Sequence, residues 1–147
     1  MTDHHRPSQQ SIETVQAGFI RAFATLTEPM TRYAYLVGLA KSLPTFPETD
    51  RCDAHLVTGC QSRTWLVDRS DADVFRFHAF SDATLVSGML AILYQTYDGR
   101  HHDALLAHPA VAFLHTLGLS AELTPGRQTG LRYVAQRIDE FSRIAAG

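Results

Sequence analysis

The chain contains two cysteines, and Cys60 is the one whose surroundings indicate chemistry. It follows Gly59 in a short polar segment with β-prone residues on both sides. Glycine adopts backbone conformations that a residue with a Cβ resists, so we expect a hairpin tip or tight loop with the thiol at its apex. The polar successors Gln61 and Ser62 oppose the alternative interpretation, a small buried hydrophobe. A thiolate is both a nucleophile and a metal ligand, so Cys60 is the first candidate for a functional residue.

The second cysteine, Cys52, lies in an acidic, proline-flanked connection. The neighbouring acids Asp50 and Asp53 would oppose formation of its thiolate, and Arg51 partly offsets them. We interpret Cys52 as an incidental thiol. A role in resolving an oxidised Cys60 as a disulfide stays open, because sequence distance alone does not decide it.

Two other chemistries compete with a role as a reactive thiol. Cys52, His55 and Cys60 place two thiols and an imidazole within nine residues, so a zinc or iron–sulfur scaffold is the main alternative. A structural zinc site usually has four ligands with paired C-x2–4-C spacing, which this segment lacks, and we expect no bound metal or cofactor. His101 and His102 stand in a loop or helix start, where histidine is commonly solvated. A thiol hydrolase needs a histidine base and an Asn or Asp; the chain contains no Asn, and we rank this function last.

Length and composition restrict the class of protein. The chain has 147 residues, a net charge of −2 and 45% apolar residues, which favours a folded domain over residues 11–147 behind a polar tail at residues 1–10. The chain has no stripe of basic residues, so nucleic acid is not expected as its main partner. No apolar run approaches the roughly 20 residues that span a bilayer. The first residues lack the apolar stretch of a signal peptide. We therefore expect a cytoplasmic protein with reduced thiols.

The hydrophobic pattern predicts an α+β fold with the order helices, sheet, helices. One helix begins after the N-cap Ser11, and a second ends near Leu43. The hairpin around Cys60 and a strand from Val74 to Phe80 would form a small three-stranded antiparallel sheet packed against the helices. Further expected helices, from their capping and turn residues, begin at Ser81-Asp82, Asp103, Pro109 and Thr124-Pro125, with Gly118 as an αL cap.

Three segments in order resemble signatures of the SufE/CsdE family of cysteine desulfurase activators. Residues 57–66 resemble the family's GCxSxxWL motif. Residues 77–90 fit its SDA..V.GL segment, and residues 117–131 are similar to its LTPSRxxGL helix start. Thr64 departs from the usual Val and Gly126 from the usual Ser. With the helical pair that precedes them, these segments cover nearly the whole chain.

A further departure is Phe80, which replaces a residue that is often acidic in the family. We expect the three departures to affect the choice of partner more than the chemistry.

The resemblance implies a non-classical, sulfur-transferring protein with a fold like that of the NifU/IscU scaffold proteins. Cys60 would accept sulfur from the persulfide of a pyridoxal-phosphate cysteine desulfurase, stimulate that enzyme, and pass the sulfur to iron–sulfur cluster assembly or another acceptor. Gly59, Gln61 and Ser62 would shape the loop. By resemblance, Asp82 and Arg127 are candidates for contacts with the loop or the partner, although each also fits a plain helix N-terminus. A monomer or weak homodimer is expected.

Overall fold

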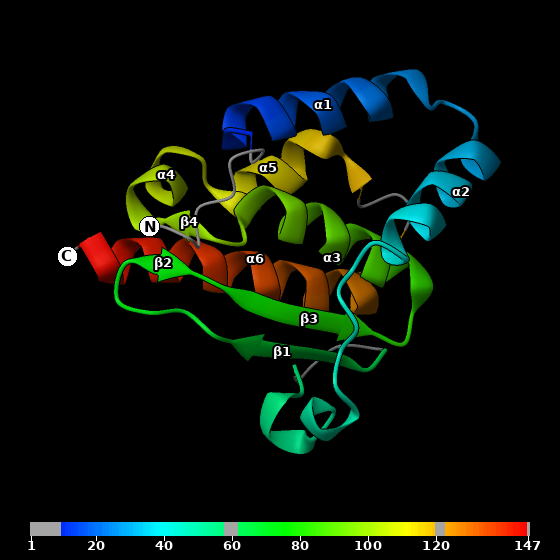
Figure 1. Ribbon diagram of the computed structural model, residues 1–147. Coiled ribbons are helices and arrows are strands. Elements are labelled where there is room, and N and C mark those ends of the chain that lie inside the picture. Colours follow the sequence, from blue (N-terminus) through cyan, green and yellow to red (C-terminus); the bar gives the residue numbers. More distant parts are fainter. Residues whose placement is uncertain (1–9, 58–61, 120–122, 147) are drawn as a thin grey trace.

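The computed structural model describes residues 10–57, 62–119 and 123–146. The chain forms two N-terminal helices, then a small sheet, and then further helices that pack on one face of that sheet (Figure 1). The α+β class and the order of elements agree with the sequence-based prediction. The helices and strands are α1 (Ile12–Thr25), α2 (Pro29–Ala40), β1 (Thr64–Asp68), β2 (Val74–Phe75), β3 (Phe77–Ser81), α3 (Thr84–Tyr97), β4 (Arg100–His101), α4 (His102–Ala107), α5 (Ala110–Leu117) and α6 (Pro125–Ala146).

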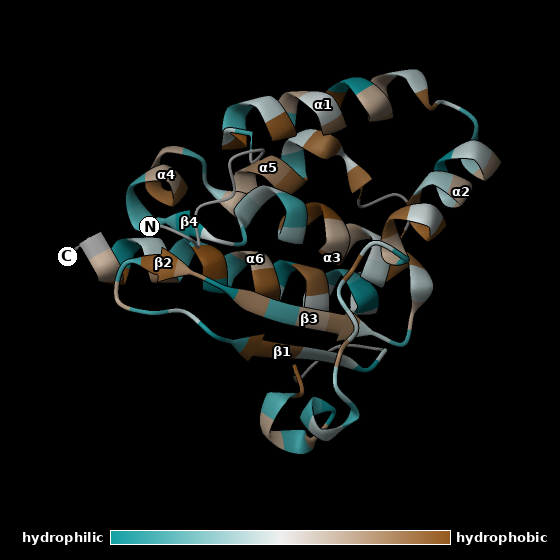
Figure 2. Ribbon diagram, viewed as in Figure 1, coloured by the Kyte–Doolittle hydropathy of each residue, from teal (hydrophilic) through white to brown (hydrophobic). Residues whose placement is uncertain are grey.

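Helix α3 occupies the centre of the fold and contacts α1, α2, α6 and β3. Every residue from Val86 to Leu93 is buried, so this helix is covered on all sides. Gly88 allows the close approach of α2, because an added Cβ would lie 2.9 Å from the carbonyl carbon of Leu36 and nearer still to its oxygen. Helix α1 alternates hydrophilic and hydrophobic residues in Figure 2, as expected for a helix with one solvated face.

The predicted three-stranded sheet is present in reduced form. Strands β1 and β3 pair antiparallel with Trp65 opposite Phe80. The expected first strand contributes a single bridge between Leu56 and Trp65, and the Val57 N–H donates to the Thr64 carbonyl at 2.8 Å. The described residues that precede and follow segment 58–61 are therefore paired with each other.

The strand expected from Val74 to Phe80 is divided into two. Its first part, β2, pairs antiparallel with the short strand β4, whereas β3 pairs with β1. The change of partner falls at Arg76, which belongs to neither ladder. The predicted alternation holds across the break, since Phe75, Phe77 and Ala79 are buried.

A segment of residues 44–57 covers the sheet face that points away from α3, and we call it the covering segment. Phe46 from this segment forms a small apolar cluster with Trp65 and Val67. The ring of Phe80 stacks on those of Phe46 and Trp65, at centroid distances of 6.1 and 6.2 Å. The guanidinium of Arg51 lies 4.2 Å from the Phe80 ring centroid, a cation–π geometry. Apolar side chains thus pack against both faces of the sheet.

Several helix boundaries follow the predicted caps, and others differ. Ser11 caps α1 by accepting from the Thr14 N–H at 3.1 Å, and Gly118 ends α5 with φ 65°. Helix α2 ends at Ala40, about three residues before the predicted stop. Helix α3 begins at Thr84, because the predicted capping residue Ser81 still belongs to β3.

Candidate functional site

The described residues on either side of the segment 58–61 are held by main-chain hydrogen bonds. Three of the predicted site residues, Gly59, Cys60 and Gln61, lie outside the described residues. Ser62 is described and half-buried. On the side before the segment, the bond from Val57 to Thr64 joins it to β1. The chain on this side of residues 58–61 is thus attached to the sheet.

Asp82 fixes the chain directly after the segment through two hydrogen bonds to one residue. Its main-chain N–H donates to the Arg63 carbonyl at 3.0 Å, and its Oδ1 accepts from the Arg63 N–H at 3.1 Å. Asp82 precedes the N-cap of α3, Ala83, and so does not itself cap the helix. The structure therefore places this carboxylate against the main chain that leads out of the loop.

Behind this contact lies a buried group of hydroxyls that residue patterns did not single out. Thr64 Oγ1 donates to Ser81 Oγ at 3.1 Å, and Ser81 Oγ accepts from the Ala83 N–H at 3.2 Å. Ser87 Oγ accepts from the Ser81 N–H at 3.0 Å and donates to the Ser81 carbonyl at 2.8 Å. Buried polar groups that are satisfied in this way give rigid, specific packing. A serine inside the otherwise apolar start of α3 was the available signal.

This network also accounts for one departure from the family pattern. Where the family usually has Val, the hydroxyl of Thr64 bonds across the β1–β3 pair to Ser81. The side chain of Thr64 is fully buried, so an unpaired hydroxyl there would be costly. The aromatic ring of Phe80, another departure, fills the apolar cluster under the covering segment.

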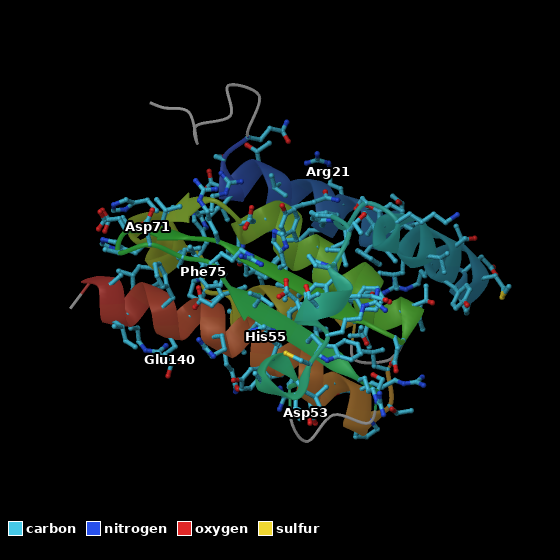
Figure 3. The ribbon with its side chains drawn as sticks, turned by 60° about the horizontal axis from the view of Figure 1, so that its bottom comes forward. Arg21, Asp53, His55, Asp71, Phe75 and Glu140 are labelled. Atoms are coloured by element: carbon cyan, nitrogen blue, oxygen red, sulfur yellow. The ribbon has the colours of Figure 1, made fainter. Side chains whose placement is uncertain are left out.

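The covering segment carries the second cysteine. Cys52 is exposed, and its Sγ lies 3.6 Å from Nδ1 of His55. The same Nδ1 lies 2.9 Å from the Asp50 carbonyl oxygen, which only accepts, so this nitrogen carries the proton and donates to it. Figure 3 shows His55 and Asp53 on this segment in front of the sheet. The proposed ligand set of Cys52, His55 and Cys60 depends on a residue that the structure does not describe.

Arg127 occupies the first turn of α6 and is exposed. Helix α6 and strand β1 run in the same direction (Figure 1), and Arg137 of α6 meets Asp68 at the end of β1 with a 3.4 Å ion pair. Ten helical residues before Arg137 correspond to about 15 Å, and four strand residues before Asp68 to about 13 Å. The turn with Arg127 therefore lies at the same end of the molecule as Thr64 and the exit of the loop.

Comparison with known structures identifies the class of fold. The solution structure of a hypothetical protein from Thermus thermophilus matches 90% of this chain and 96% of its own, with a TM-score of 0.68. At 22% identity this likeness concerns the fold alone. In the described part of the chain, no helix is long and apolar enough to cross a bilayer.

Sequence comparison identifies the family. Residues 17–142 match the SufE family, described as an Fe-S metabolism associated domain. The sulfur acceptor protein CsdE of Escherichia coli is 34% identical over 128 residues, which cover 85% of this chain and 86% of CsdE. An uncharacterized SufE-like protein of Rhizobium etli is also 34% identical, over 84% of this chain and 86% of its own. The chain belongs to the SufE family, as its three motifs predicted.

Proposed function

We propose that this protein accepts sulfur on Cys60 from the persulfide of a pyridoxal-phosphate cysteine desulfurase and thereby stimulates that enzyme. The observation that carries the proposal is the family match over residues 17–142, together with a relative of 34% identity that is named a sulfur acceptor. Cys60 is the cysteine that stands inside the GCxSxxWL-like motif, and Cys52 stands outside it. The sulfur would then pass to iron–sulfur cluster assembly or a related acceptor.

The chemistry of the step is an exchange at a sulfur–sulfur bond. The Cys60 thiolate attacks the outer sulfur of the desulfurase persulfide, and the desulfurase cysteine leaves as a thiolate. The products are a Cys60 persulfide and a free desulfurase thiolate, so no external oxidant or reductant is consumed. Release of the desulfurase for a further turnover is the source of stimulation.

The described surroundings of the loop support this function in a specific way. A transfer between two proteins needs a thiol whose carrier segment is correctly oriented at the moment of encounter. The bonds from Asp82 to Arg63 and from Val57 to Thr64 hold both sides of the segment to the sheet. Gly59, Gln61 and Ser62 are proposed to shape the loop on this base.

The partner would approach the end of the molecule where these elements meet. Arg127 lies at that end and is proposed to contact the loop or the desulfurase. A guanidinium suits carboxylates on a partner surface. We further propose that the protein acts in the cytoplasm, as a monomer or weak homodimer.

The test is incubation with a cysteine desulfurase and L-cysteine, followed by intact-mass measurement. The protein should gain the mass of one sulfur atom, which a thiol reductant removes, and desulfurase turnover should rise. Cys60→Ser should lose both effects, and the matched control Cys52→Ser should keep both. Full stimulation by Cys60→Ser would overturn the proposal.

Metal content separates the scaffold alternative from the carrier. A scaffold using Cys52, His55 and Cys60 would retain close to one equivalent of zinc or iron after purification, and Cys52→Ser would remove it. A carrier shows no metal that depends on these three residues.

A further inference from the structure

A second group of side chains with metal-ligating atoms lies on the ribbon formed by β2 and β4, which Figure 1 shows beside α4. The pairing sets Val74 opposite His101, and the His102 N–H donates to the Asp73 carbonyl at 2.9 Å. One ligand atom from each of Asp73, His101 and His102 lies within 4.8 Å of the other two. In the described part of the chain, no other group of three such side chains comes this close.

The backbone on both sides of this group is fixed before any ion binds. The carboxylate of Asp71, labelled in Figure 3, accepts from the N–H groups of Asp73 and Val74, both at 2.8 Å. On the other strand, the Gly99 N–H donates to the Phe75 carbonyl at 2.7 Å. Ligands held on rigid secondary structure are placed more precisely than ligands on loops.

The two histidine rings lie close to a further carboxylate, that of Asp103. The His102 side chain is only 15% exposed, and its buried Nδ1 has no hydrogen-bond partner among the described residues, although Asp103 Oδ1 lies 3.2 Å away. Nδ1 of His101 lies 3.6 Å from Oδ2 of the same carboxylate. In metal sites a carboxylate commonly takes the second ring N–H of a bound histidine and orients it. The exposed Asp103 side chain lies near both rings, and rotation of this side chain would let it take this role.

We propose that Asp73, His101 and His102 form a binding site for a divalent transition-metal ion, with zinc as the first ion to test. Two imidazoles and one carboxylate are ligands that Zn²⁺ accepts, whereas Mg²⁺ and Ca²⁺ prefer oxygen alone. Three protein ligands leave a position for water or an external ligand. Without metal, Nδ1 of His101 accepts from the Asp103 N–H at 3.2 Å. A metal on Nε2 of His101 would leave a proton on Nδ1, which would then donate to the Asp103 carboxylate.

This site goes beyond sulfur transfer and is separate from it. Asp73 precedes Ser81 by eight residues along nearly extended chain, or about 25 Å, and Ser81 pairs with Thr64, four residues after Cys60 in sequence. An ion held there joins β2 to β4 and to the first turn of α4. Its expected effect is therefore on the stability of this ribbon.

The test uses the full chain after treatment with a chelator, titrated with zinc chloride in a calorimeter. The Cys52→Ser/Cys60→Ser background removes thiol ligands, and His4→Ala/His5→Ala removes the histidine pair of the N-terminal segment. Binding of one equivalent should persist in both backgrounds. The His101→Ala/His102→Ala variant should lose on the order of 100-fold in affinity or more, since loss of an orienting group alone costs 10–100-fold.

The exposed His115 gives the matched control, and His115→Ala should bind zinc unchanged. Should a variant fail to fold, imidazole NMR signals of the unmodified protein answer the question, because substoichiometric zinc should shift those of His101 and His102. Absence of binding, equal affinity in the His101→Ala/His102→Ala variant, or shifts confined to other histidines would overturn the proposal.

Discussion

Substitution of Asp82 tests whether the contact beside the Cys60 segment affects both stability and the proposed sulfur transfer. Asp82→Ala removes the acceptor of the Arg63 N–H but leaves the main-chain bond in the other direction. A hydrogen bond to a charged acceptor contributes about 1.5–3 kcal/mol when buried. Because Asp82 is exposed, we expect a loss of about 1 kcal/mol in the free energy of unfolding.

Urea denaturation measures this loss directly. With a slope of about 2 kcal/mol/M, the midpoint should fall by about 0.5 M. Local opening at Arg63 should show more clearly, as amide exchange about fivefold faster at that residue, since 1.4 kcal/mol corresponds to a factor of ten. Asp82→Asn keeps an acceptor oxygen of the same shape and should recover most of the protection. This variant separates the hydrogen bond from the charge.

The same pair of variants tests whether the loop base matters for sulfur transfer. A binding-competent loop conformation that becomes less populated lowers the apparent affinity by the same fraction. We therefore expect Asp82→Ala to stimulate a desulfurase several-fold less at limiting protein, and Asp82→Asn to stay close to the unmodified protein. An unchanged Arg63 amide and an unchanged urea midpoint in Asp82→Ala would refute this reasoning.

Three further predictions concern the stability of the fold. Gly88→Ala should lower the free energy of unfolding in urea melts by about 3 kcal/mol, because the added Cβ would contact the α2 main chain. Gly38→Ala, which has open space at its Cβ, should be neutral or stabilising. Equal effects of the two substitutions would contradict the packing argument. Asp139→Ala should cost about 2 kcal/mol, since Asp139 accepts from two N–H groups at the start of α5 at 2.7 and 3.2 Å; a melting temperature within error of the unmodified protein would count against this. Burial raises the pKa of Tyr97 above its usual 10. The neutral Tyr97 side chain therefore contributes its whole stabilisation below pH 10, and this stabilisation is lost as pH rises above that value. Tyr97→Phe, which also loses the 2.9 Å bond from Gln16, should flatten the alkaline fall in stability, and an unchanged profile would reject the assignment.

Local signals predicted much of the architecture. Ser11 is an N-cap and Gly118 is an αL cap, as their residue types indicate. The alternation of Phe75, Phe77 and Ala79 gave the buried face of the middle strands. The start of α3 was predicted too early, because Ser81 still pairs with Thr64 in the sheet, and its hydroxyl accepts from the N–H of the N-cap residue Ala83 and not from a residue within the helix.

Contacts between distant residues could not be predicted in this way. The bond from Thr64 to Ser81 depends on the register of β1 against β3. The capping of α5 by Asp139 depends on how α6 packs beside it. Periodicity fixes which face a residue occupies, but it does not fix the partner across from it.

The amino-acid order alone therefore determined the fold class, the main helices and the family, because capping, periodicity and a contiguous motif such as residues 57–66 are local properties. Only the tertiary structure decided that Asp82 accepts from the Arg63 N–H and that Asp73 has a ligand atom within 4.8 Å of those of His101 and His102. Both results depend on strand pairing, in which main-chain hydrogen bonds and side-chain burial act together across long separations in sequence.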